Sequence, residues 1–179
     1  MSATPGLERH RRRAAIATRL LEAAPDAAAA LDWDALDRGP AWLAVPDTEL
    51  ALEQRRIGAT LNTAAIRLWI DRRRLAAART AVGEAFLRAL LADPAAPDVA
   101  PHVVVAPDGG SDIAEWLRQA GAAVQAAAIS DSPLGQAAAI ALCGRAGGAL
   151  QLAAETARGL IEHARRIGAT LATAAPETQ

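Results

Sequence analysis

The side chains that could carry out catalysis are few and widely spaced in this sequence. The three histidines, His10, His102 and His163, lie in a basic N-terminal cluster, a proline-rich stretch and a predicted helix, respectively. None belongs to an HxxxH or HExxH pair, so their spacing does not predict a helical metal site. Cys143 follows the apolar run AIAL, which favours a buried and inert thiol. It would serve as a nucleophile only beside a histidine that lowers its pKa.

One stretch combines a histidine with an anion-binding pattern. The sequence PDGGSD at 107–112 places two glycines and Ser111 before a predicted helix, whose backbone N–H groups could hold an anion. An ordinary turn followed by an N-cap explains the same residues. If the chain binds a small ligand or is an enzyme, we expect its site here, lined by His102, Asp108 and Ser111. The chain contains no P-loop, GxSxG elbow or dinucleotide-binding fingerprint.

The composition favours helices. Of the 179 residues, 49 are alanine, which is the best helix former and a poor strand residue. All 19 basic residues are arginine, and the net charge of -1 argues against a nucleic-acid-binding domain. A single cysteine excludes an intrachain disulfide framework. These features predict a compact orthogonal all-α bundle of about seven or eight short helices, with at most one isolated strand.

Hydrophobic segments long enough to cross a membrane are missing from the sequence. No run of about 18 apolar residues occurs, so no transmembrane helix is expected. The N-terminus resembles a signal peptide only superficially, because Glu8, Arg19 and Glu22 interrupt its apolar run. We therefore expect a cytoplasmic protein.

Start and stop signals divide the chain into predicted helices. We expect a short helix and an extended arm over 26–46, and N-caps at Asp47 and Asp112, with Glu115 completing the pattern at Asp112. Gly83 is the expected C-cap between two helices. The other expected helices cover residues 4–24, 47–70, 71–82, 84–92, 113–127, 132–143 and 150–172.

A loop rich in proline and glycine separates two predicted lobes of one domain. The N-terminal lobe covers 1–93, the linker 94–110 and the C-terminal lobe 111–179. Within the linker, the apolar run at 103–105 is the only candidate strand, and a single strand makes no sheet.

Arginines and tryptophans are the candidate interface residues. Arg9, Arg12 and Arg13 share one face of the first predicted helix, where they meet an acidic partner, lipid headgroups or only solvent. Trp33 and Trp42 either dock on a partner or fill a core that is short of large residues.

An internal repeat is the strongest regularity in the sequence. RRIGATLNTAA at 55–65 recurs as RRIGATLATAA at 165–175, with ten of eleven positions identical. The match fades outside this window, so duplication of a whole domain is not supported. Two surface helices of similar composition would explain the repeat, and so would two copies that present the same face to equivalent surfaces.

The segment at 41–91 resembles the K component of bacterial type III secretion systems, the family of SctK and YscK. Its landmarks occur in a compatible order, and further ones follow after residue 115. They are Trp42-Leu43 before Pro46, the helix from Leu50 to Gly58, Arg67 to Ile70, Gly83 before Phe86, and then Trp116, Gly121 and Ser132-Pro133-Leu134.

The resemblance implies a non-enzymatic cytoplasmic adaptor without a cofactor. Such an adaptor joins the inner-membrane ring, at the cytoplasmic face of the membrane, to the pods of the sorting platform and the ATPase. A ligand-binding protein or enzyme using residues 102–111, and a secretion chaperone or effector, are the alternatives. The candidate partner-binding residues are Arg9, Arg12, Arg13, Trp42, Arg72, Arg73 and Arg74.

Overall fold

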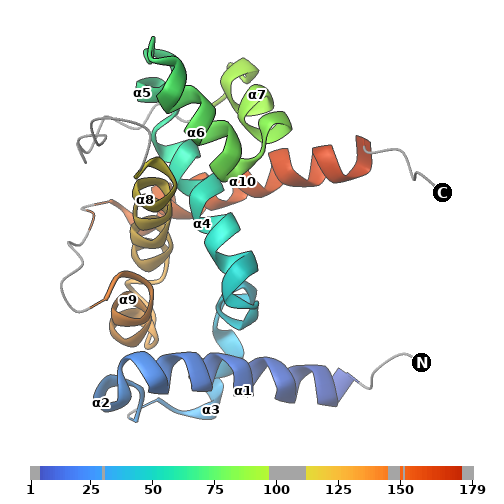
Figure 1. The fold of residues 1–179 in the computed structure, drawn as a ribbon. Coiled ribbons are helices and arrows are strands. Elements are labelled where there is room, and N and C mark those ends of the chain that lie inside the picture. Colours follow the sequence, from blue (N-terminus) through green and yellow to red (C-terminus); the bar gives the residue numbers. More distant parts are fainter. Residues whose placement is uncertain (1–4, 30, 97–111, 145–149, 151, 175–179) are drawn as a thin grey trace.

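Helices are the only regular secondary structure of the described residues. The computed structural model describes residues 5–29, 31–96, 112–144, 150 and 152–174, and within these ranges it contains ten α-helices, one 3-10 turn and no strand (Figure 1). The all-α prediction is confirmed, but the expected number of seven or eight helices was wrong. The elements are α1 (Pro5–Ala23), α2 (Pro25–Ala28), α3 (Trp33–Arg38), η1 (Ala41–Ala44), α4 (Asp47–Leu61), α5 (Thr63–Arg67), α6 (Arg72–Val82), α7 (Glu84–Ala92), α8 (Ile113–Ala128), α9 (Gly135–Cys143) and α10 (Ala154–Ala174).

The segment at 26–46 contains more helix than the predicted short helix and extended arm. It forms α2, α3 and η1, because each has a start signal of its own. Pro25 occupies the first turn of α2, and Asp32 caps α3 by accepting a hydrogen bond of 2.7 Å from the backbone N–H of Ala35. Pro40, in an extended conformation, precedes η1. Helical turns therefore replace the arm.

The helix predicted over 47–70 is broken at Asn62. The Asn62 side chain donates a hydrogen bond of 2.8 Å to the Gly58 carbonyl, and α4 ends one residue earlier. An asparagine that bonds to its own helix backbone competes with continuation of the helix. The chain then starts again as α5, which accounts for one of the additional helices.

The predicted N-cap at Asp47 was wrong, and the one at Asp112 is confirmed in its position but not in its side-chain hydrogen bond. Pro46 occupies the N-cap position of α4, and the Asp47 carboxylate forms an ion pair of 2.6 Å with Arg19 instead of capping. Asp112 occupies the N-cap position of α8, but its side chain accepts no hydrogen bond from the helix. The predicted C-cap at Gly83 is confirmed, since its φ of 92° is a conformation that favours glycine.

Two buried apolar clusters form the core. The first core lies between α4, α5, α6, α7, α8 and α10, and the second lies between α1, α2, α3, η1, α9 and the neighbouring parts of α4 and α8. Fully buried members of the first core include Ile57, Phe86, Leu87, Leu90, Leu117 and Leu160. Those of the second core include Ile16, Leu20, Leu43 and Leu134.

Helices α4 and α8 connect the two cores through a close backbone contact. A Cβ atom added to Gly58 would lie 1.9 Å from the Leu117 carbonyl oxygen, and one added to Gly121 would lie 1.8 Å from the Gln54 carbonyl oxygen. The two helices can therefore pack at this distance only because each has a glycine facing the other backbone. Beside them, Gln54 donates a buried hydrogen bond of 3.2 Å to Gln125.

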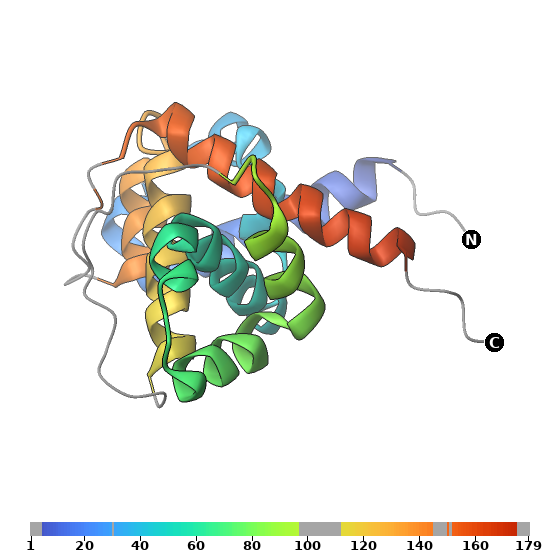
Figure 2. The same ribbon diagram turned by 90° about the horizontal axis from the view of Figure 1, so that it is seen from above.

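The packing does not follow the predicted division at residues 94–110. Each core contains residues from both sides of that segment, since Ile57 and Leu160 share the first core and Leu20 and Leu134 share the second. Helix α1 lies across one end of the molecule and the α5–α6 connection lies at the opposite end (Figure 1). Seen from above, α1 and α10 extend toward the same side of the molecule (Figure 2). The candidate strand at 103–105 lies outside the described residues.

Candidate interaction surfaces

The three arginines predicted on the first helix hold α1 to the following segment. Arg9 and Arg13 both form ion pairs with the carboxylate of Asp37 in α3, and Arg12 donates a hydrogen bond to the Gly39 carbonyl. The Asp37 side chain is only 15% exposed, so these contacts are shielded from water on one side. The three arginines of α1 therefore have a structural role, although the Arg9 side chain stays 65% exposed.

The two tryptophans of the same region have opposite environments. Trp42 is 3% exposed and belongs to the second core, so in this conformation it offers no surface to a partner. Trp33 is 61% exposed, and the Arg13 guanidinium lies 5.9 Å from the centre of its ring. An exposed tryptophan with a stacked arginine is typical of interface anchors. We call Arg9, Arg13 and Trp33 the α1 surface.

Arg72 and Arg73 at the start of α6 are exposed, whereas the Arg74 side chain is only 23% exposed. Asp71 caps this helix by accepting a hydrogen bond of 2.8 Å from the Arg73 backbone N–H, and it lies 3.8 Å from the Arg74 guanidinium. Arg72 and Arg73 have no side-chain hydrogen bond or ion pair with the described residues. Their charges are therefore available to a partner.

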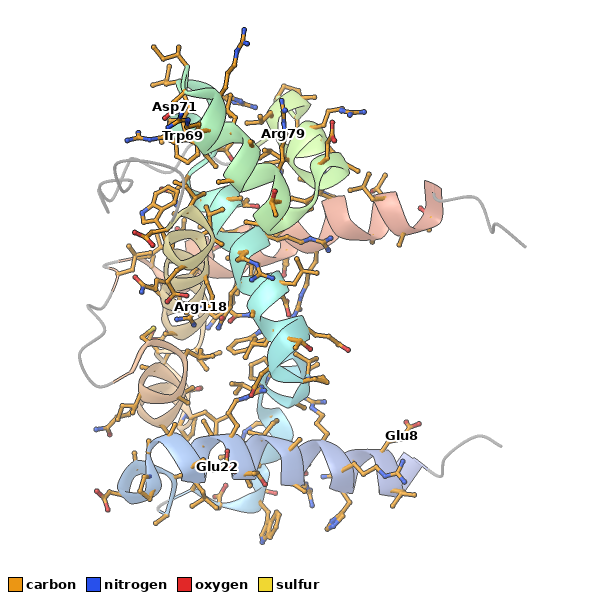
Figure 3. The ribbon with its side chains drawn as sticks, viewed as in Figure 1. Glu8, Glu22, Trp69, Asp71, Arg79 and Arg118 are labelled. Atoms are coloured by element: carbon orange, nitrogen blue, oxygen red, sulfur yellow. The ribbon has the colours of Figure 1, made fainter. Side chains whose placement is uncertain are left out.

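Two exposed aliphatic side chains precede these arginines. Leu68 is 81% exposed and Ile70 is 96% exposed, whereas Trp69 between them packs on Trp116 with 5.9 Å between ring centres. Sequence reasoning missed them, because it placed them at the end of a predicted continuous helix. The apolar run followed by DRRR was the available signal. We call residues 68–73 the tip, which Figure 3 places at the opposite end of the molecule from Glu8 and Glu22 of α1.

Two clefts are lined in part by α4. One, of about 830 Å³, is lined by parts of α1, η1, α4, α8 and α9, and its cations are already paired. Arg19 donates to the Leu43 and Val45 carbonyls at 2.5 and 2.7 Å, and Arg118 forms an ion pair of 2.6 Å with Glu115. The other, of about 470 Å³, lies between α4 and α10.

Within the described part of the chain, two possible reactive features are an activated Cys143 thiol and a metal-binding cluster. Burial raises the pKa of the Cys143 thiol, although the nearby Arg118 charge acts in the opposite direction, so the thiol is not activated as a nucleophile. The described residues contain no group of three or more histidine, cysteine or acidic side chains that could hold a metal ion. His102, Asp108 and Ser111, the predicted site of the enzymatic alternative, lie outside the described residues.

His163 is buried in a small polar cluster. It is 6% exposed, its Nδ1 atom lies 2.8 Å from the Arg166 guanidinium, and its Nε2 atom lies 3.4 Å from the Asp93 carboxylate. Burial lowers the pKa of His163, Arg166 lowers it further, and Asp93 opposes both. The ring is therefore neutral at pH 7 and links the end of α7 to α10.

Membrane-spanning helices are not found in the described part of the chain, where none of the helices combines sufficient length with sufficient hydrophobicity. Comparisons with protein-family models, with curated proteins and with solved structures found no match. The resemblance to the K component of type III secretion systems therefore stays a prediction.

Proposed function

We propose that this chain is a non-enzymatic adaptor of a bacterial type III secretion apparatus, which links the inner-membrane ring to the sorting-platform pods and the ATPase. The observation that carries this proposal is the position of the two exposed arginine-bearing surfaces. The α1 surface and the tip lie at opposite ends of the molecule (Figures 1 and 3). A linker needs two separate attachment surfaces, and a compact helical body holds them at a fixed distance.

The residue types at both ends suit protein recognition. Tryptophan and arginine are enriched among the side chains that dominate binding energy. Trp33 and Arg13 combine them at the α1 surface, and Arg72 and Arg73 are unpaired at the tip among the described residues. Of the predicted contacts, Arg9 and Arg13 contribute partly through their exposed atoms, whereas Arg12 and the buried Trp42 support the fold.

Affinity purification of the tagged chain from its native host, followed by mass spectrometry, tests the proposal. We expect the wild-type chain to retain ring, pod or ATPase components. Trp33→Ala should reduce the recovery of one partner by about thirtyfold, as for a hot-spot residue. Arg73→Glu should reduce the recovery of a different partner. Arg79→Glu is the matched control, because Arg79 is also exposed on α6.

Recovery of none of these components from cells that express the secretion system would overturn the proposal. Loss of all partners with Arg79→Glu as well would show a general charge effect. The alternative function, a ligand-binding protein or enzyme using residues 102–111, would then be tested by ligand screening.

A further inference from the structure

We propose that the tip is a binding site for an anionic membrane surface, in which Leu68 and Ile70 enter the headgroup region while Arg72 and Arg73 bind lipid phosphates. This inference rests on the proposed function in one respect only: the proposed function identifies the inner membrane as the membrane that the chain meets in the cell. Lipid binding by the purified chain follows from the tip itself and is tested separately.

The backbone holds Leu68 and Ile70 in an outward position. Leu68 ends α5 in a helical conformation, with φ of -87° and ψ of -6°, and the Trp69 ring between the two aliphatic side chains packs against Trp116. Turn hydrogen bonds of 3.1 Å from the Leu68 and Trp69 backbone N–H groups secure the segment on one side, and the Asp71 cap secures it on the other. The two aliphatic side chains are therefore exposed by a well-supported backbone.

The charge around these side chains suits phosphate groups. Residues 67–74 contain four arginines and one aspartate, so the segment has a net charge of 4 - 1 = +3. The Asp71 carboxylate accepts a hydrogen bond from the Arg73 backbone N–H and pairs with the Arg74 guanidinium. The Arg72 and Arg73 side chains have no ion pair with the described residues. Guanidinium groups bind phosphate oxygens in a bidentate manner, and their aliphatic stems lie well at the boundary of the acyl chains.

The size of the tip suits a membrane surface, which a few side chains can contact. A protein partner attached there would need further surface around the tip, because a stable protein interface buries about 800 Å² on each partner. The tip offers two strongly exposed aliphatic side chains, Leu68 and Ile70, which are followed in the sequence by Arg72 and Arg73. Trp69 and Asp71 of the same segment lie at one end of the molecule (Figure 3). A lipid surface adapts to such a projection, and each basic residue near it adds to the affinity.

This contact is expected to be weak and reversible by itself. Stable membrane association usually takes two signals, so the tip would act together with the protein partners of the adaptor. Because the attraction depends on exposed charges, binding should fall steeply as salt increases.

Sedimentation of the purified full-length chain with vesicles tests the proposal. We expect binding to vesicles of phosphatidylcholine mixed with phosphatidylglycerol and not to vesicles of phosphatidylcholine alone. Arg72→Gln with Arg73→Gln should weaken binding by about thirtyfold. Leu68→Ser with Ile70→Ser should also weaken vesicle binding, because no aliphatic side chain then enters the headgroup region. Arg79→Gln and Leu21→Ser, which change an exposed arginine and an exposed leucine elsewhere, should have no effect.

A fluorescent label reports insertion directly. Cys143 is the only cysteine, so Cys143→Ser with Ile70→Cys gives a single attachment point for an environment-sensitive dye. The dye at residue 70 should show a blue shift with anionic vesicles. The matched label, Ala169→Cys on the exposed side of α10, should show none.

Several results would overturn the lipid proposal. They are undiminished binding of the tip variants, equal binding to neutral vesicles, no binding of the wild type to anionic vesicles at low salt, and equal shifts at both labels. Loss of a protein partner in the tip variants without any lipid binding by the wild type would leave the tip as a protein-contact surface of the adaptor only. Failure of the adaptor function would leave vesicle binding intact, so the two proposals fail separately.

Discussion

The two copies of the RRIGATL repeat have the same local structure and different surroundings. In the first copy Thr60 donates to the carbonyl four residues earlier, that of Arg56, at 2.9 Å. In the second copy Thr170 makes the same bond to Arg166 at 3.0 Å. The central isoleucines, at 57 and 167, are both buried in the first core. These shared features depend on neighbours within one helical turn, so identical sequences reproduce them.

The glycines of the two copies show what differs. Gly58 lies against the backbone of α8, whereas the nearest atom to an added Cβ at Gly168 is Nη1 of Arg56, 3.7 Å away. The residues that follow Gly58 are buried, and the corresponding residues of α10 are largely exposed. The repeat therefore does not bind two equivalent surfaces. The first copy contacts α8 where the two cores meet. The second copy buries Ile167 in the first core and leaves its other side largely exposed.

The single difference between the copies coincides with a difference in helix length. Asn62 of the first copy corresponds to Ala172 of the second. Helix α4 ends immediately before Asn62, but α10 continues to Ala174. Because alanine offers no side-chain donor to the preceding turn, the helix is not interrupted there. The one residue that differs between the copies therefore lies where the first helix ends and the second continues.

Alanine substitution of the equivalent glycines is the strongest test of this comparison. Gly58→Ala should lower the free energy of unfolding by at least about 3 kcal/mol, because its methyl group meets a backbone carbonyl that moves only if α4 and α8 separate. Gly168→Ala should raise it by up to about 1 kcal/mol through higher helix propensity. Urea denaturation followed by tryptophan fluorescence measures both. Similar effects at the two sites would contradict the difference described for the two copies.

The residues just before the repeats predict different responses to pH. Position 163 is a buried histidine, and the equivalent position 53 is a glutamate. Because the pKa of His163 is lowered from 6.5, the folded chain binds fewer protons at this ring than the unfolded chain as the pH falls below 6.5. The contribution of the neutral His163 ring to the free energy of unfolding is therefore fully present above pH 6.5. It is lost progressively as the pH falls from 6.5 through the lowered pKa of the folded chain.

His163→Gln should reduce this loss of stability on mild acidification, measured as unfolding free energies at neutral and acidic pH. Glu53→Gln serves as the control, since it leaves the histidine in place. An unchanged pH dependence in His163→Gln would show that another group causes the acid sensitivity.

Exchanging the residues that differ between the copies should alter both helix ends. Asn62→Ala should cost about 1 kcal/mol, because the side-chain bond to the Gly58 carbonyl is lost. Ala172→Asn should cost no more than about 0.7 kcal/mol and should weaken amide protection in the last turn of α10. Hydrogen exchange of these segments measures the change. Equal protection in both variants and the wild type would mean that this position does not set helix length.

The smallest expected effect concerns the ion pair that connects the two repeat helices. Arg165 of α10 donates to Glu53 of α4 at 2.8 Å through Nε and 2.6 Å through Nη2. The pair is partly exposed, so a double-mutant cycle of Glu53→Gln and Arg165→Gln should give a coupling of about 0.5 kcal/mol. A coupling near zero would leave apolar packing as the main contact between the copies.

Much of the fold could be predicted from the sequence, but less of the candidate surfaces. The positions of α1, α6, α7 and the Gly83 cap followed from local signals, namely proline, glycine and apolar periodicity. The pairing of Arg9 and Arg13 with Asp37 could not be predicted, because it joins residues 24 to 28 positions apart that meet only after α1 and α3 pack together. For the same reason, the sequence left open which of Trp33 and Trp42 is buried.

The amino-acid sequence by itself determined the all-α class, most helix starts and stops, and the hydrogen bonds that threonines make within one turn. Those depend on backbone propensities and on neighbours three or four residues away. Only the tertiary structure decided that Gly58 contacts α8, that Arg13 is paired, and that Leu68 and Ile70 are exposed at one end. Burial and pairing depend on which helix faces are brought together over long separations, and an identical local sequence can therefore serve either as a core contact or as an outer surface.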